Sequence, residues 1–306
     1  MRIGVVALGS QADRVIAQAQ RAEEDGFSSL WFTGAVPGDP LIPMTLAARA
    51  TSSIEVGTAV QQTYAAHPLL QASRAISAAE AIGAPGRFTL GVGPSHRPSI
   101  EGRLGLSYDT PGRHTDEYVQ ILAALLRGEQ VSFAGQEFTV NAGPLPVPDG
   151  LEVPVLVAAL GPRLLRVAGQ YTAGTIPWMA SAKAIEDHIA PLIRKAAAEA
   201  GRPAPRIVAG LPVAVHDDVA EARAAAAEQF ATYGQLPNYQ RILARGGIAG
   251  PADAVIVGDE ASVTRQIKEL FEAGATDVWL PAFPVGPDRS ASRARTRALL
   301  KELARS

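Results

Sequence analysis

Short apolar runs alternate with longer segments of mixed polarity along the whole chain. The runs cover residues 3–8, 29–32, 54–60, 88–92, 153–158, 175–178, 207–215 and 277–281. Most of the intervening segments repeat apolar residues every three to four positions, which is typical of amphipathic helices. Near-continuous apolar strands separated by helices predict an α/β protein whose parallel sheet is covered by helices.

Eight strands are the number that closes a (β/α)8 TIM barrel, and we expect this fold. Insertions are expected after strand 4 and between strands 7 and 8. The first comprises a loop over 94–110 and a hairpin within 130–150 that turns at 134–136. The alternative, a doubly wound open sheet, is disfavoured because the first strand–helix turn lacks a Gly-x-Gly-x-x-Gly pattern. No linker interrupts the chain, so residues 1–306 are expected to form a single domain.

The amino-acid composition excludes several classes of protein and several kinds of chemistry. Of 306 residues, 47% are hydrophobic, which is too many for a disordered chain. The 28 basic and 30 acidic residues give a net charge of −2, so no nucleic-acid partner is expected. Cysteine is absent, which excludes disulfides and thiolate chemistry. No apolar run approaches the ~18 residues that span a bilayer, and we expect a cytoplasmic protein that does not contact membranes.

Candidate chemistry belongs at the carboxyl ends of the strands, where TIM barrels carry their sites. The five histidines have no metal-ligand spacing, so no metal site is expected, and His67 before Pro68 is expected to cap or pack. No lysine falls at a strand end, which argues against a Schiff-base enzyme. These ends are rich in small residues, which suits a flat ligand that brings its own chemistry.

Two loops at strand ends are candidates for binding an anionic cofactor. Residues 158–162 run from a strand into a helix, so their amides could hold a phosphate with Arg163 nearby. Small residues at such a turn also simply permit tight packing, and this second interpretation stays open. Residues 91–96 end another strand and bring Ser95 and His96 to the barrel mouth.

Aromatic residues near strand ends suggest an apolar or aromatic-sided cavity, although such residues are more often barrel packing. They are Trp31, Phe32, Tyr64, Trp178 and Phe283.

Several short motifs occur in one order along nearly the whole chain. They are Gly57-Thr58-Ala59-Val60, His67-Pro68, Gly86-Arg87-Phe88-Thr89-Leu90-Gly91-Val92-Gly93, Pro154-Val155-Leu156-Val157-Ala158-Ala159, Ala173-Gly174-Thr175-Ile176 and Gly258-Asp259-Glu260-Ala261-Ser262-Val263. The ordered set resembles the luciferase-like monooxygenase and oxidoreductase superfamily. The turns at 91–96 and 158–162 are most similar to the members that use coenzyme F420, a 5-deazaflavin.

The resemblance implies a TIM barrel that forms a homodimer, with a small-molecule substrate and F420 as cofactor. It also implies a non-proline cis peptide between Ala59 and Val60, behind the deazaflavin ring. The cofactor-binding residues that it implies, together with the two loops above, are Thr33, Thr58, Ala59, Val60, Gly93, Ser95, Ala158, Ala159, Leu160, Gly161 and Arg163.

The chain also departs from the family pattern. Sugar-phosphate dehydrogenases of this family carry an Asp-His pair where this chain has Gly34 and Ala35, and His96 replaces their catalytic glutamate. We therefore expect hydride transfer from reduced F420 to a C=C or C=N bond, with His96 as the proton donor. His96 as a plain loop residue remains an alternative. So do an FMN-dependent monooxygenase of the same superfamily and a barrel that binds a ligand without turnover.

Overall fold

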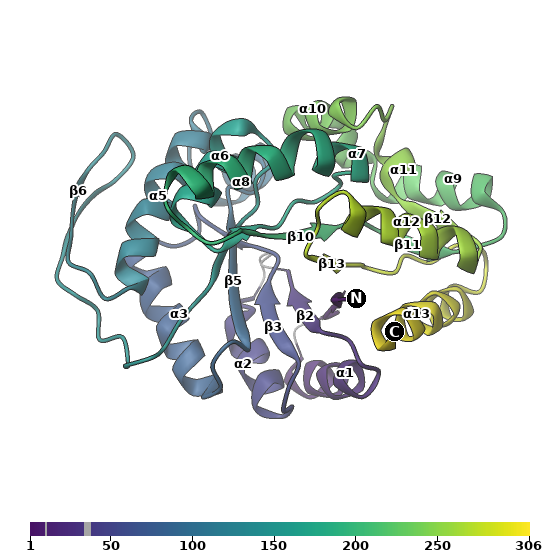
Figure 1. Cartoon of the computed structure of the whole chain (residues 1–306), viewed down its shortest axis with the longest axis horizontal. Coiled ribbons are helices and arrows are strands. Elements are labelled where there is room, and N and C mark those ends of the chain that lie inside the picture. Colours follow the sequence, from purple (N-terminus) through teal and green to yellow (C-terminus); the bar gives the residue numbers. More distant parts are fainter. Residues whose placement is uncertain (10, 34–37) are drawn as a thin grey trace.

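A closed parallel barrel forms the centre of the molecule (Figure 1). The computed structural model describes residues 1–9, 11–33 and 38–306. Within this part the ring consists of β1 (Ile3–Val6), β2 (Ser29–Phe32), β3 (Glu55–Thr58), β5 (Phe88–Gly93), β8 (Val155–Val157), β9 (Gly174–Thr175), β10 (Arg206–Gly210) and β13 (Asp277–Trp279). β3 pairs with both β2 and β5, which closes the ring, and every pairing in it is parallel. The predicted (β/α)8 barrel is confirmed.

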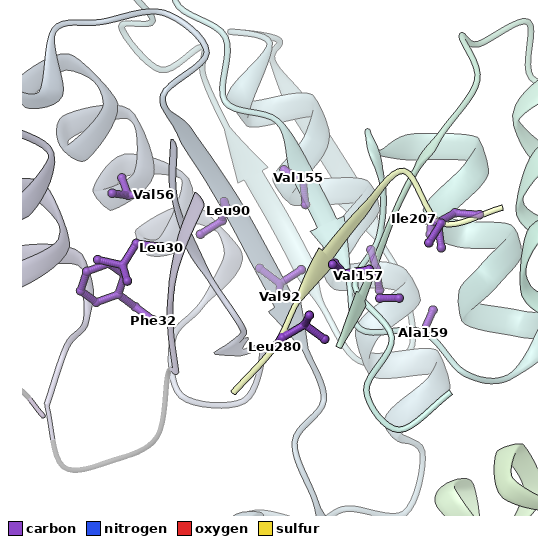
Figure 2. Packing of buried hydrophobic residues seen from close by; sticks show 14 of the residues in the cluster. Leu30, Phe32, Val56, Leu90, Val92, Val155, Val157, Ala159, Ile207 and Leu280 are labelled. Atoms are coloured by element: carbon purple, nitrogen blue, oxygen red, sulfur yellow. The ribbon is translucent and has the colours of Figure 1, made fainter. Parts of the chain in front are cut away.

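Helices surround the barrel on its outer face (Figure 1). The longer ones are α1 (Ala12–Glu24), α2 (Leu41–Arg49), α3 (Pro68–Ile82), α5 (Pro111–Leu126), α6 (Pro162–Tyr171), α8 (Ala190–Glu199), α12 (Glu260–Glu272) and α13 (Arg289–Arg305). Alternate residues of each strand point out toward these helices, and Figure 2 shows Leu30, Leu90 and Val157 in this layer. Burial of this continuous apolar layer is the main source of stability.

The other residues of each strand fill the barrel interior. Trp31, Leu156 and Val208 are completely buried there and belong to one cluster with Trp279. Trp31 fits because its neighbour Gly57 has no side chain: a Cβ there would lie 2.5 Å from the indole. The interior is therefore a packed core rather than a channel, as expected for this fold.

Charged residues close the amino-terminal end of the barrel. Arg206 lies 3.0 Å from Glu55 and 2.9 Å from Asp277, and Arg2 binds the same two carboxylates at 2.6 and 2.5 Å. The carboxylates are only 8% and 2% exposed, and Thr89 donates a further hydrogen bond to Glu55. These interactions satisfy the polar groups that the start of the strands brings inside.

The insertion that follows the fourth barrel strand has two parts. Residues 94–110 were expected to be loop, but they contain α4 (Arg97–Ser99) and the π-helix η1 (Ile100–Leu104). The hairpin prediction is confirmed: β6 (Val131–Ala134) pairs with β7 (Thr139–Ala142) and projects from the body of the protein (Figure 1). Glu117 of α5 accepts hydrogen bonds from the three turn amides of 136–138 and so fixes the hairpin to the barrel.

The region between the last two barrel strands differs from prediction. The apolar run 207–215 was expected to be one strand, but β10 ends at Gly210 because Pro212 has no N–H for the ladder. The chain resumes as β11 (Val213–Val215), which pairs with the unpredicted β12 (Ile256–Gly258). The insertion between them contains α9 (Val219–Gln229), η3 (Ala231–Gln235), α10 (Pro237–Arg245) and α11 (Pro251–Ala254).

One predicted helix, over 181–200, is not continuous. It consists of α7 (Ala182–Ala184), the π-helix η2 (Ile185–Ile189) and α8. Pro191 is the second residue after the π-helical turn, and its ring nitrogen has no N–H to donate to a backbone carbonyl of that turn. The resulting turn directs His188 into the protein, where it is only 6% exposed.

Candidate functional site

Three strand ends meet at the carboxyl end of the barrel. The Ala59–Val60 peptide is cis, as predicted, and it separates β3 from β4 (Gln61–Gln62), which pairs with β5. At the end of β5, a Cβ on Gly93 would lie 2.8 Å from the Ala158 Cβ and 3.0 Å from Val60 Cγ2. The structure therefore brings Val60, Gly93 and Ala158 together, and Ala59 belongs to the same cluster.

The two threonines among the predicted cofactor residues have different surroundings. Thr58 is completely buried, and its hydroxyl donates to the Gly91 carbonyl and accepts from the Gly91 N–H, both at 2.8 Å. Because the O–H is already donated to Gly91 and the side chain is completely buried, Thr58 joins two strands beneath the site instead of presenting a hydrogen-bond donor to a ligand. Thr33 is exposed after the end of β2. Gly34 and Ala35, where the family's Asp-His pair is replaced, lie outside the described residues.

The loop after β8 leads directly into α6. Ala159 is buried, Leu160 is half-buried and Gly161 is the exposed N-cap, which makes no side-chain cap hydrogen bond. The amides of the first helical turn are thus left without a side-chain cap, and they carry the positive end of the helix dipole. Arg163, expected to assist with a phosphate, lies 3.2 Å from Asp116 of α5, so its charge is partly balanced within the protein.

His188 supports this loop from below. Its Nε2 lies 2.9 Å from the Leu160 carbonyl, which accepts the hydrogen bond. Burial lowers the pKa of His188, the bond to Leu160 opposes this shift, and the charge of Arg245 adds to it. The sequence shows only a histidine within a predicted helix, so this contact could not be foreseen.

His96 follows Ser95, which adopts an unusual backbone conformation. Ser95 has φ +62°, and Tyr108 donates a hydrogen bond of 2.6 Å to its carbonyl. His96 is half-buried, and its ring contacts the rings of Tyr233 and Tyr239, with centroids 6.1 and 5.7 Å away. Left-handed backbone at a residue other than glycine is costly and concentrates at functional sites.

Burial lowers the pKa of His96 below its usual value of about 6.5. Its imidazole is therefore neutral at pH 7, with one N–H that can donate. For the expected role of His96 as proton donor, this means that its protonated form is a stronger acid but is less populated at neutral pH.

Several aromatic residues near His96 were not identified from the sequence. Tyr233 and Tyr239 lie in the insertion between β11 and β12, where no strand-end signal marks them. Trp279 could have been found, because alternation along β13 places it on the same inner face as Asp277. Tyr108 lies in the segment that was expected to be loop. Of the aromatic residues that were suggested, Trp31, Phe32 and Phe283 are buried packing, whereas Trp178 and Tyr64 are half-buried.

The remaining histidines have structural contacts. His67 caps α3, because its Nδ1 accepts from the Leu69 N–H at 3.2 Å. His114 stacks on Tyr64 with ring centroids 3.7 Å apart. Within residues 1–9, 11–33 and 38–306, no three metal-ligating side chains gather at one place. In the same part of the chain, no helix has the length and apolar character that crossing a membrane requires.

Comparison with known proteins gives matches over nearly the whole chain. The family model described as luciferase-like monooxygenase matches residues 1–277. The F420-dependent hydroxymycolic acid dehydrogenase of Mycobacterium tuberculosis is 31% identical over 301 residues, covering 89% of this chain and 81% of that protein. The 5,10-methylenetetrahydromethanopterin reductase of Methanolobus tindarius is 27% identical over 290 residues, covering 94% of this chain and 86% of that protein.

Solved structures share the fold. The coenzyme F420-dependent tetrahydromethanopterin reductase of Methanopyrus kandleri superposes with a TM-score of 0.76 at 21% identity, covering 99% of this chain and 96% of that one. An F420-dependent secondary alcohol dehydrogenase has the same TM-score and identity, and covers 97% of each chain. At this identity the two structures support the fold alone.

Proposed function

The chain belongs to the luciferase-like monooxygenase family, and on that premise we propose that it is an F420-dependent oxidoreductase. It transfers a hydride between F420 and a small organic substrate, and it reduces a C=C or C=N bond. The relative named as an F420-dependent dehydrogenase supports the cofactor and the reaction class.

One observation carries the proposal in this chain: Val60, Gly93 and Ala158 meet at the barrel mouth. These three residues present a small, apolar surface to the mouth, and such a surface accommodates a flat ring. The uncapped first turn of α6 offers backbone N–H groups to an anionic tail, so the residues present fit F420. When bound, F420 supplies or accepts the hydride.

The chain itself binds, orients and protonates. The backbone N–H groups on either side of Pro162, which has none itself, hold the anionic tail, and His188 fixes the Leu160 carbonyl. His96 moves the proton that must accompany hydride transfer, because negative charge accumulates on the reduced substrate. Tyr108 positions His96 through its hydrogen bond to Ser95.

Cofactor preference tests this function directly. We expect oxidised F420 to bind at least tenfold more tightly than FMN, a difference of about 1.4 kcal/mol, when both are titrated into the purified protein. F420 carries a phosphate followed by glutamates, and so presents more negative charge to the amino end of α6 than FMN does. Equal or reversed affinities would instead favour an FMN-dependent monooxygenase.

We further infer that the chain acts in the cytoplasm as a single domain that pairs into a homodimer. Ile42 and Leu46 lie one turn apart on α2 and are 68% and 42% exposed, which supports an apolar contact between copies. Light scattering on the purified protein checks this, and a monomeric mass at micromolar concentration would contradict it.

A further inference from the structure

Four aromatic rings from separate parts of the chain form a continuous surface at the barrel mouth. We call Trp178, Tyr233, Tyr239 and Trp279 the aromatic wall. Trp178 stacks on Trp279 with centroids 4.8 Å apart and an interplanar angle of 28°. Trp178 also meets the edge of Tyr233 at 6.0 Å, and Tyr233 meets Tyr239 at 4.8 Å. The rings come from the segment after β9, from β13 and from the insertion between β11 and β12.

The aromatic wall is in direct contact with His96, the proposed proton donor. His96 contacts both tyrosines of the wall edge-on. Trp178 and Tyr233 are half-buried, as His96 is, so their rings remain accessible to a small molecule. Tyr239 and Trp279 are only 7% and 6% exposed and support the first two from behind.

The backbone on both sides of this surface is held in a costly conformation. Among the described residues other than glycine, only Ser95 and Met179 have positive φ, at +62° and +59°. Ser95 immediately precedes His96, and Met179 immediately follows Trp178. The Met179 N–H donates to the Gly210 carbonyl at 3.0 Å, and Tyr108 holds Ser95. The surrounding structure therefore fixes the orientation of the His96 and Trp178 side chains. Costly backbone conformations of this kind are typical of residues that must face a ligand.

Among the described residues, no charged side chain contributes to the pKa shifts of His96 and the two wall tyrosines. The pKa of Tyr239 is raised by burial, with Tyr233 and Tyr108 as the only contributing neighbours. Burial raises the pKa of Tyr233, and the neighbouring Trp178 acts against this rise. Burial alone lowers the pKa of His96. Arg97, the cation next in sequence, binds Glu101 and the Tyr108 carbonyl and is exposed. An anionic group placed here could accept a hydrogen bond from the unpartnered indole N–H of Trp178 or Trp279, but no cation contributes to the pKa shifts of these rings, so the lost hydration of the charge would be poorly compensated.

We propose that the aromatic wall binds the substrate and restricts it to uncharged compounds with a flat conjugated ring beside the reacting double bond. The proposal rests on the function proposed above and deepens it. The ring of the substrate stacks or packs edge-on against Trp178 and Tyr233, which places the double bond near His96. Offset and edge-to-face ring contacts of this kind favour aromatic over aliphatic partners.

In the reaction, the π bond of the C=C group breaks and two C–H bonds form. One carbon would receive the hydride that bound, reduced F420 would supply, and the two electrons of that hydride balance the reduction. The other carbon receives a proton from the imidazolium form of His96, which is left neutral and is protonated again by water. A conjugated ring and carbonyl make the double bond electron-poor, which is the property that hydride addition requires.

Two matched probes test the substrate class: 4-phenylbut-3-en-2-one, which is neutral, and its para-carboxylate. Each is titrated by calorimetry into the protein loaded with oxidised F420, so that no turnover occurs. We expect the neutral probe to bind at least tenfold more tightly than the carboxylate. Equal affinities, or tighter binding of the carboxylate, would overturn the proposal.

Variants then test the wall itself. Tyr233→Ala should weaken the neutral probe at least tenfold, and Tyr233→Phe, which keeps the ring, should restore most of the affinity. Tyr171→Ala removes a half-buried tyrosine from the far end of α6 and serves as the matched control. If Tyr233→Ala leaves the probe affinity unchanged, or weakens F420 instead, the wall does not bind the substrate.

Failure of the two proposals is distinguishable. F420 affinity is measured first, and absence of F420 binding would refute the proposed function. If F420 does not bind, the same two probes are titrated into the free protein, because the aromatic wall is formed by side chains of the chain alone. Should Tyr233→Ala fail to fold, the comparison of probes on the unsubstituted protein decides.

Discussion

Replacing Arg206 with methionine tests whether the charged cluster at the amino-terminal end of the barrel stabilises the fold. Methionine keeps much of the volume but leaves Glu55 and Asp277 buried with only Arg2 as a cationic partner. Removing one partner of a buried ion pair costs about 3–5 kcal/mol. Because Arg2 still lies 2.6 and 2.5 Å from the two carboxylates, we expect the lower end, about 3 kcal/mol.

Thermal and urea unfolding measure this loss. The entropy of unfolding scales with chain length, and for 306 residues a loss of about 3 kcal/mol lowers the Tm by about 5 °C. Arg265→Met is the matched control, because Arg265 pairs with Glu269 at 2.7 Å but is 64% exposed. An exposed pair of this kind is worth at most about 0.5 kcal/mol. A loss for Arg206→Met no larger than that of the control would refute the reasoning.

The effect must also depend on pH. Burial by itself would raise the pKa of Asp277, but the hydrogen bonds and charge of Arg206, with help from Thr276 and Arg2, lower it. A carboxyl whose pKa is lower in the folded state stabilises fully above its unfolded pKa of about 3.9. That contribution is lost as the pH falls through the folded value. The difference between the unsubstituted protein and Arg206→Met should therefore shrink below about pH 4, and a constant difference down to pH 2 would contradict this.

Three further predictions concern the site and the hairpin. His96→Ala should lower kcat about 10²–10⁴-fold while F420 affinity stays within a few fold of that of the unsubstituted protein. In the unsubstituted protein kcat should fall above the pKa of His96, which is lower than 6.5, and this fall should disappear in the variant. Unchanged turnover would mean that His96 is only a loop residue. Gly93→Ala should lower the free energy of unfolding by about 1–3 kcal/mol and weaken F420 binding, because the new Cβ would lie 2.8 Å from Ala158. Gly102→Ala is the control, since its Cβ would meet nothing within 4 Å, and equal melting temperatures for the two variants would argue against the close approach. Glu117→Gln should speed hydrogen exchange at the hairpin turn amides, which lose a charged acceptor worth about 1.5–3 kcal/mol per bond, and unchanged exchange there would show that the anchor is dispensable.

The sequence predicts the barrel well because its signal is local. Each barrel strand is a buried apolar run, and each run lies between segments with helical periodicity. The hairpin turn at Gly135 is equally visible in the local sequence, whereas the close approach of Glu117, 2.2 Å from where a Cβ of Gly135 would lie, is a tertiary contact. The cis peptide after Ala59 was expected from the family resemblance alone, since nothing in the spacing of these residues requires it.

Tertiary contacts account for most of what was missed. β12 has only three residues and forms because β11 lies beside it, so no pattern within it is long enough to detect. Tyr233 and Tyr239 reach His96 from more than 130 positions away in the chain, and His188 reaches Leu160 from another helix. Sequence reasoning found the residues on strand ends but not those that other elements bring to them.

In this barrel, the charged amino-terminal end and the aromatic carboxyl end serve different purposes: the first stabilises the fold and the second contacts the substrate. The network around Arg206 secures the fold at one end, and no residue of the aromatic wall belongs to it. Substitutions at the mouth that change substrate choice therefore leave the stabilising ion pairs at the other end intact. This eases the usual trade-off between gaining a new activity and losing folding stability. Directed evolution of this scaffold can therefore vary Trp178 and Tyr233 freely while leaving Glu55, Arg206 and Asp277 untouched.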